Sequence, residues 1–260
     1  MADMEISGDG DLKGLKMQLS RSPEYVQAAY RSMTGRVGLR SSGKVFAIGM
    51  NKTGTSSLHR TFKELGFSSY HGTRWTTGQN KWLMHAFDCF SDGVRPDFRT
   101  LDQNFPGSKF ILNVRAFDDW AISRLKHIAR DIAANGDGDR AENWTASPDA
   151  INHWLDNREK HHSAILEYFA GRPDDLCIIN FVTDANASTK VSDFLGRPAP
   201  AAKAWANAAS GRGENPAHRE MLNEVLQQRG LSVEAAKRDI LVLQDPSGRF
   251  PVDTSQLDAS

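Results

Sequence analysis

The stretch that most limits what this chain can fold into is residues 44–58, KVFAIGMNKTGTSSL. A short apolar strand runs through a turn with Gly49, Lys52 and Gly54 into a helix start rich in hydroxyl groups. The glycines let the backbone bend close to an anion, and the first amides of the helix point donors at it, beside the hydroxyls of residues 55–57. The positive end of the helix dipole also favours phosphate there. The segment therefore predicts a phosphate-binding loop that leads from a strand into a helix.

The position of the lysine in this loop bears on which nucleotide it binds. In ATP and GTP loops of the form G-x-x-x-x-G-K-[ST], the lysine follows the last glycine and reaches the terminal phosphates. In this chain Lys52 precedes Gly54, in the run KTGTSS at residues 52–57. That order resembles the 5′-phosphosulfate loop of sulfotransferases that use 3′-phosphoadenosine 5′-phosphosulfate (PAPS). The alternative is an ordinary strand-to-helix turn with an incidental surface lysine.

A second element, residues 105–123, has the order strand, arginine, helix. Its apolar run at 110–114 is short enough for a buried parallel strand. Asp118 or Asp119 is expected to be the N-cap of the helix that follows. Arg115 then stands at the carboxyl end of the strand.

This element resembles the 3′-phosphate site of sulfotransferases, in which an arginine at a strand end and a serine eight positions later bind the phosphate on the ribose. Arg115 and Ser123 match those positions. Arginine suits the task because its planar guanidinium makes charge-assisted hydrogen bonds with phosphate oxygens, and a hydroxyl donates one more. A strand-end arginine alone would indicate a solvated charge or an ion-pair partner. Two elements in this order and spacing favour the sulfotransferase interpretation.

The resemblance extends more loosely over residues 44–200, with matches at 64–71, 87–92 and 176–181 and in the run FLGRP at 194–198. It implies an α/β fold in three layers, a parallel sheet flanked by helices, of the P-loop nucleotide-kinase-like sulfotransferase type. The regions on either side of residues 44–200 are not covered by it.

Periodicity and capping signals predict strands that alternate with helices, which implies a parallel sheet with helices on both faces. In such sheets ligands bind outside the carboxyl ends of the strands, where both phosphate elements fall. We expect an N-terminal arm with a short helix at 1–43, a sulfotransferase core at 44–200 and a C-terminal helical extension of the same domain at 201–260. The expected strands are residues 44–48, 67–70, 109–114 and 176–181, and the expected helices are residues 23–32, 56–65, 119–134, 148–169, 187–194, 217–229 and 233–243.

Composition restricts the class of protein. With 260 residues, 39% of them hydrophobic, the chain is long enough for one large domain with its own core. Its formal net charge of zero argues against a nucleic-acid binder, so locally clustered cations must attract any polyanionic ligand. Two cysteines, Cys89 and Cys177, lie in apolar runs typical of buried thiols.

The sequence has no apolar run of the length that a signal peptide or a membrane span requires. The tripeptide at residues 51–53 is formally a glycosylation acceptor, but it lies inside the predicted phosphate loop, where a glycan would block the site. We therefore expect a cytoplasmic protein.

The resemblance implies direct sulfuryl transfer from PAPS to a hydroxyl or amine of a small-molecule, glycan or lipid acceptor, with no metal. As in phosphoryl transfer, the attacking and leaving oxygens lie in line, and the protein supplies positioning and positive charge. Lys52 would steady the leaving phosphate oxygen. Arg212, in a degenerate match to the family's late Arg-Lys-Gly loop, is a candidate clamp on the cofactor. The other cofactor-binding residues that the resemblance implies are Asn51, Thr53, Gly54, Thr55, Ser56, Ser57, Arg115 and Ser123.

The acceptor must lose a proton, so a general base is expected. Family members use a histidine or a carboxylate, and the chain offers Asp92, His71 and Asp88, in that order of preference. Each has a structural alternative: His71 as an ordinary loop histidine, and either aspartate as a helix cap or an ion-pair partner.

Two other classes of protein remain open. A P-loop kinase or nucleotidase would place an aspartate for magnesium at the end of an apolar strand, but the run at 110–114 ends at Arg115. A catalytically silent PAPS-fold module, kept for binding or assembly, is the other alternative. We interpret residues 135–143 as a flexible turn, because they lack the spacing of a calcium loop. The pair His161 and His162 is interpreted as the solvated face of a long helix.

Overall fold

The structure is a computed structural model, and it describes residues 43–76, 81–136, 144–198 and 215–240. The predicted helix at 23–32 and Arg212 lie outside these ranges. Among the described residues, no helix is both long and apolar enough to cross a membrane.

A parallel sheet of five strands, in the order β2-β3-β1-β4-β5, forms the centre of the molecule. This arrangement, with helices on both faces, confirms the predicted α/β fold. One strand, β3, was not among the predicted strands, because its apolar run is only Cys89 and Phe90, between polar residues on both sides. The strands are β1 (Val45–Ala47), β2 (Ser69–His71), β3 (Cys89–Ser91), β4 (Lys109–Asn113) and β5 (Leu176–Ile179).

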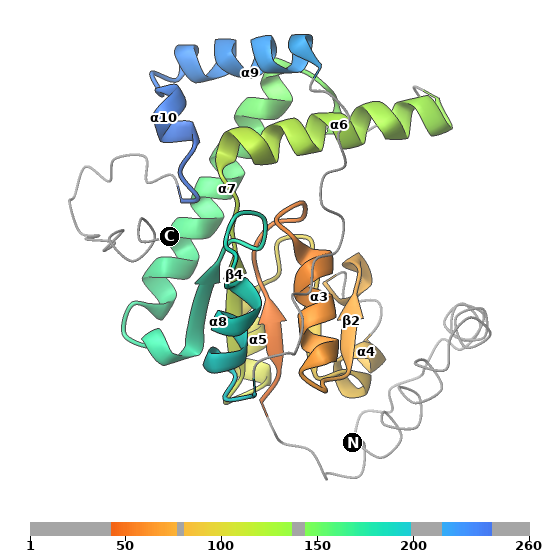
Figure 1. Cartoon of the computed structure of the whole chain (residues 1–260), viewed down its shortest axis with the longest axis vertical. Coiled ribbons are helices and arrows are strands. Elements are labelled where there is room, and N and C mark those ends of the chain that lie inside the picture. The colour runs from red at the N-terminus through yellow and green to blue at the C-terminus, as the bar shows by residue number, and fades with distance from the viewer. Residues whose placement is uncertain (1–42, 77–80, 137–143, 199–214, 241–260) are drawn as a thin grey trace, which may run out of the picture.

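Helices follow the strands along the chain, and Figure 1 shows them on both sides of the sheet. The short helices after β2 and β3 were not predicted. In the described ranges the α-helices are α3 (Thr55–Glu64), α4 (Lys81–Ala86), α5 (Phe98–Asn104), α6 (Phe117–Asn135), α7 (Pro148–Phe169), α8 (Ala187–Phe194), α9 (Pro216–Gln228) and α10 (Val233–Ala236), and the 3-10 turns are η1 (Thr73–Trp75) and η3 (Pro173–Asp175).

Alternating side chains of the strands build two separate cores. In β1, Phe46 points to the face covered by α4, α5 and the second half of α7, whereas Val45 and Ala47 point to the face covered by α3 and α8. The result is a helix, sheet and helix layering around two apolar clusters.

A third apolar cluster lies beyond the carboxyl ends of the strands. It joins α6, the first half of α7, α9 and α10, with Trp120, Leu155 and Leu222 fully buried in it. Figure 1 shows these helices above the sheet, with the far end of α6 projecting to one side. The described part of the predicted C-terminal extension, residues 215–240, therefore packs on α6 and α7.

Three local predictions were wrong. The helix expected at 233–243 ends at Ala236, as α10. The N-cap of α6 is Ala116, so the helix begins earlier than expected, and Asp118 and Asp119 lie in its first turn, where the helix dipole still favours their charge. His161 and His162 are not solvated, because α7 is covered both by the sheet and by the third cluster: His161 Nε2 lies 2.6 Å from the carbonyl oxygen of Ile48, and His162 is buried. Burial lowers the pKa of both imidazoles.

The turn after β1 depends on the close approach of Gly49 to β4. A Cβ at this position would stand 2.0 Å from the backbone oxygen of Asn113. We expect Gly49→Ala to lower the free energy of unfolding by about 3 kcal/mol, because overpacking against backbone cannot relax by a side-chain rotation. Urea denaturation measures this. The control is Gly171→Ala, which adds a Cβ with no described atom within 4 Å, and equal stability of the two variants would contradict the expectation.

Candidate active site

The loop between β1 and α3 is held in place from the end of β4. The Gly49 amide donates to Asn113 Oδ1 at 3.1 Å, and Asn113 Nδ2 donates to the hydroxyl of Thr53. Thr53 in turn donates to the carbonyl oxygen of Met50 at 2.6 Å and is 1% exposed. The Thr53 hydroxyl therefore shapes the loop, and only its backbone amide is left to contact a ligand.

The first turn of α3 presents its amides to this loop. Gly54 has φ 84, a left-handed conformation that suits glycine, and a Cβ there would meet Phe181 at 2.6 Å. No described side chain caps the helix, and its first turn has no acidic residue. The amides of Ser57 and Leu58 donate to the Gly54 carbonyl, whereas those of Thr55 and Ser56 precede the first bonded amide. This is the geometry of an anion site at a helix N-terminus.

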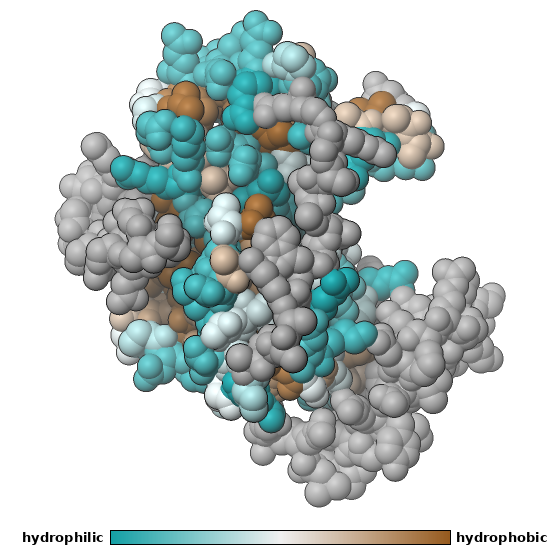
Figure 2. Space-filling view, in the orientation of Figure 1, coloured by the Kyte–Doolittle hydropathy of each residue, from teal (hydrophilic) through white to brown (hydrophobic). Residues whose placement is uncertain are grey.

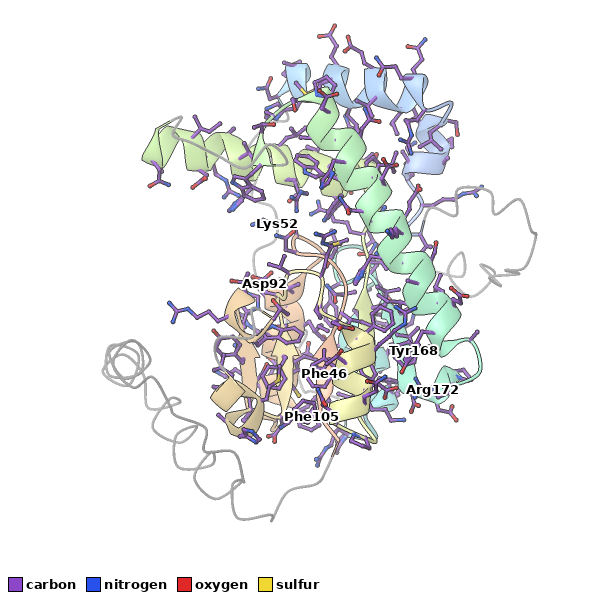
Figure 3. The ribbon with its side chains drawn as sticks, turned by 180° about the vertical axis from the view of Figure 1, so that it is seen from behind. Phe46, Lys52, Asp92, Phe105, Tyr168 and Arg172 are labelled. Atoms are coloured by element: carbon purple, nitrogen blue, oxygen red, sulfur yellow. The ribbon has the colours of Figure 1, made fainter. Side chains whose placement is uncertain are left out.

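Lys52 lies at the turn of the loop with φ 66, and its Nζ is 3.2 Å from His127 Nδ1 on α6. Burial lowers the pKa of Lys52, and the nearby carboxylate of Asp92 opposes this shift. In Figure 3 the labelled Lys52 and Asp92 lie one above the other beneath α6. Figure 2 shows a notch in the outline of the molecule between the projecting end of α6 and the elements below it.

Arg115 joins the second phosphate element to the first. It follows β4 by two residues, and its NH1 group donates to the carbonyl oxygen of Lys52 at 3.1 Å. Burial lowers the pKa of Arg115, and its Nε is buried without a partner among the described residues. Ser123 lies on α6 and is half-buried. Two segments 63 positions apart thus meet at the carboxyl edge of the sheet.

Asn51, at the start of this turn, is bound by α6. Its carbonyl oxygen accepts from Trp120 Nε1 at 2.7 Å, and its Oδ1 accepts from Arg124 NH1 at 2.8 Å. The guanidinium carbon of Arg124 lies 5.1, 5.1 and 4.6 Å from the ring centres of Trp120, Trp144 and Trp154, and burial lowers its pKa to about 10. Asn51 therefore connects the loop to α6.

The C-terminal segment supports the Arg115 backbone. The buried Arg158 of α7 donates both to the carbonyl oxygen of Arg115 and, at 2.6 Å, to that of Asp239. Asp239 Oδ1 also accepts from Asn180 Nδ2 at 2.7 Å. The segment after α10 is thus tied to the connection between β4 and α6.

Asp92 and His71 stand beside the loop, at the ends of β3 and β2. Asp92 has φ 63, and its Oδ1 accepts from the Thr55 hydroxyl at 3.1 Å. His71 Nε2 is 3.3 Å from Ser56 Oγ, and His71 Nδ1 is 3.0 Å from Ser91 Oγ. Burial lowers the pKa of His71, Asp92 raises it and Lys52 lowers it further. Lys52, Asp92 and His71 therefore lie within electrostatic reach of one another.

Asp88 is not brought to this site. It precedes β3, at the amino edge of the sheet, where its Oδ2 accepts from the amide and the hydroxyl of Ser68 at 3.1 and 2.6 Å. Because β3 separates Asp88 from Asp92, the two carboxylates lie at opposite edges of the sheet. Asp88 is therefore removed from the candidate bases.

Sequence reasoning missed two residues of α6, His127 and Arg124, that contact the loop. They follow Ser123 on the same helix, and their spacing of three places both on one face of it. The sequence does not show that this helix crosses the loop, so their contact with the loop could not be predicted. Within the described ranges, no group of three or more His, Cys, Asp and Glu side chains is arranged to hold a metal ion.

Comparison with known proteins agrees with this geometry. The model of the sulfotransferase domain family matches residues 44–175, which include the loop, Asp92, His71 and the Arg115 element. A search of curated proteins found no match. Since the family match covers half of the 260 residues, the chain belongs to the sulfotransferase domain family, and its activity is the transfer of a sulfuryl group.

Proposed function

We propose that this sulfotransferase uses PAPS as donor and transfers its sulfuryl group to a hydroxyl or amine of a small-molecule, glycan or lipid acceptor. The observation that carries the proposal is the hydrogen bond from Arg115 NH1 to the Lys52 carbonyl oxygen, which brings two phosphate elements together at one edge of the sheet. A nucleotide with phosphate at both its 5′ and 3′ positions matches such a pair of sites.

At the 5′ end, the amides of residues 52–56 would bind the phosphate, with Ser56 Oγ beside them. The Thr53 hydroxyl is used inside the loop, and the Ser57 amide is used by the helix. At the 3′ end, Arg115 would contribute its guanidinium and Ser123 its hydroxyl. Asn51 acts by holding the loop against α6.

In the transfer, a bond forms between the acceptor oxygen or nitrogen and sulfur while the bond from sulfur to the 5′-phosphate oxygen breaks. Lys52 would place its ammonium against the departing oxygen, where negative charge accumulates. The pair of electrons leaves with adenosine 3′,5′-bisphosphate, and the acceptor proton passes to a base.

We assign the base to Asp92, with His71 as the second candidate. Only one carboxylate oxygen of Asp92 is hydrogen-bonded among the described residues, to Thr55, so the other is left to take a proton. Both ring nitrogens of His71 already face serine hydroxyls. Asp92 also stands close enough to Lys52 to raise its pKa, which puts the proposed base beside the proposed catalytic lysine.

Calorimetry with adenosine 3′,5′-bisphosphate, adenosine 5′-monophosphate and ATP tests the donor assignment. We expect the bisphosphate to bind most tightly, without added magnesium. Tighter binding of ATP with magnesium would instead support the kinase alternative. A screen for transfer of labelled sulfate from PAPS then tests the donor in the reaction itself, and absence of transfer to every acceptor would count against PAPS as donor.

Arg115→Ala is expected to weaken binding of adenosine 3′,5′-bisphosphate about 30-fold, because a charge-assisted contact with the 3′-phosphate is lost. Adenosine 5′-monophosphate lacks that phosphate, so its affinity should change less than about threefold. The two ligands and two proteins form a thermodynamic cycle that isolates the contact. An equal loss for both ligands would mean that Arg115 acts only through the Lys52 carbonyl.

A further inference from the structure

The second half of α6 carries two basic side chains that the proposed donor site does not use. His127 and Arg130 are three residues apart and therefore share a face of the helix. That face is turned toward Lys52, since His127 Nδ1 lies 3.2 Å from Lys52 Nζ. Arg130 is exposed and lies close enough to lower the pKa of both Lys52 and His127.

Both side chains have unused hydrogen-bond donors. His127 Nδ1 faces the Lys52 ammonium and so acts as acceptor, which leaves the proton of the neutral ring on Nε2, where no described residue accepts it. Arg130 donates its Nε to the Lys126 carbonyl oxygen at 3.3 Å. No described carboxylate lies within ion-pair distance of its two remaining guanidinium nitrogens.

The charged groups that face His127 are mainly cationic. Burial lowers the pKa of His127; Lys52, Arg130 and Arg124 lower it further, and Asp131 alone raises it. Asp131 is itself engaged by Asn135 Nδ2 at 2.8 Å and by Trp144 Nε1 at 3.4 Å. Among described residues, the field beside Lys52 is therefore positive on the α6 side and negative on the opposite side, where Asp92 stands.

We propose that His127 and Arg130 form a subsite for a negatively charged group of the acceptor, so that this enzyme sulfates anionic acceptors such as hydroxy acids or acidic sugars. This inference rests on the proposed function, because it places the acceptor hydroxyl between Lys52 and Asp92. An acceptor carboxylate next to that hydroxyl would bind the Arg130 guanidinium and the His127 Nε2 proton. Arg130 is exposed and His127 is half-buried, so an acceptor can reach both side chains from solvent.

Paired compounds that differ only in charge test the subsite. We would measure binding of the 2-hydroxy acid mandelate and its methyl ester, and of p-nitrophenyl glucuronide and p-nitrophenyl glucoside, to protein saturated with adenosine 3′,5′-bisphosphate. At least one acid should bind about tenfold or more tightly than its neutral partner, the difference that one charge-assisted contact makes. If no acid binds more tightly than its neutral partner, the proposal is wrong.

Substitutions of Arg130 test whether this residue causes the preference for the acid. Arg130→Ala should remove the preference for the acid, Arg130→Glu should reverse it, and Arg130→Lys should keep part of it. The control Lys63→Ala removes an exposed cation at the far end of α3 and should leave the preference unchanged. A preference that survives Arg130→Glu would overturn the assignment.

Binding of the bisphosphate alone shows whether Arg130 contacts an anionic group of the acceptor or a phosphate of the donor. Its affinity should be the same in wild type and in Arg130→Ala. A loss of about tenfold or more would assign Arg130 to the donor phosphates and overturn the acceptor subsite. Failure of the bisphosphate to bind the wild type at all would instead refute the proposed function itself.

Discussion

Lys52→Ala should lower kcat for sulfuryl transfer about 1,000-fold while it changes the affinity for adenosine 3′,5′-bisphosphate less than about threefold. The reason is that a donor aimed at the departing oxygen stabilises the charge of the transition state, and removing such a group costs 10²- to 10³-fold in other enzymes. The amides of residues 52–56, which would hold the ground-state phosphate, are not removed by this change. Steady-state transfer of labelled sulfate and calorimetry measure the two quantities.

Lys52→Arg and Lys63→Ala are the controls for this result. The arginine keeps the charge but not the compact geometry of the ammonium, so kcat should fall less than with alanine. Lys63 is exposed at the end of α3, away from the loop, and its loss should not change kcat. An unchanged kcat in Lys52→Ala would refute the role of the lysine.

The pH dependence of kcat/KM for PAPS, which reports pKa values of the free enzyme, gives a second test of the Lys52 charge. Burial lowers the pKa of Lys52 below its usual 10.5, so the ammonium loses its proton at a lower pH than a solvated lysine would. The value of kcat/KM should therefore decline on the alkaline side with a midpoint below 10.5. In Lys52→Arg this decline should move to higher pH, because the guanidinium stays protonated.

Asp92→Asn should lower kcat about 1,000-fold with the affinity for adenosine 3′,5′-bisphosphate unchanged. The amide is nearly isosteric and its oxygen still accepts from Thr55, but it cannot take the proton of the acceptor, and a general base contributes 10²- to 10⁴-fold. Fixed-time assays of labelled sulfate transfer, with the fastest acceptor found in the screen, measure this loss of kcat.

His71→Ala and Asp88→Asn complete this test. Asp88 lies at the amino edge of the sheet, so its substitution should leave kcat unchanged. His71→Ala should lower kcat less than Asp92→Asn if the histidine only orients Ser56 and tunes the local charge. A larger loss with His71→Ala than with Asp92→Asn would assign the base to the histidine, and near-normal rates in both would refute both assignments.

The local parts of the site were visible in the sequence because they are short contiguous runs. A strand, a glycine-bearing turn and a helix start fix where the amides of residues 54–56 point, whatever the remaining chain does. The strand that ends before Arg115 likewise sets that residue at the carboxyl edge of a parallel sheet. The family match over residues 44–175 agrees with this interpretation.

The side chains that the sequence could not place are those whose position depends on another element. Asp88 and Asp92 are four residues apart and look equivalent as candidates, but β3 carries them to opposite edges of the sheet. His127 and Arg124 reach the loop only because α6 packs across the end of the sheet, a geometry set by the third apolar cluster. His162 became buried for the same reason, since α7 packs against both the sheet and that cluster.

The sequence by itself predicted the class of ligand, because the order of lysine, glycine and hydroxyl residues in one loop sets which backbone donors would face an anion. The tertiary structure alone decided which acid, imidazole and guanidinium groups surround that loop. Strand order and helix packing place side chains from distant segments within a few ångströms of one another, and no local pattern encodes that placement. The charge distribution around Lys52, with Asp92 on one side and the α6 cations on the other, is therefore a property of the fold.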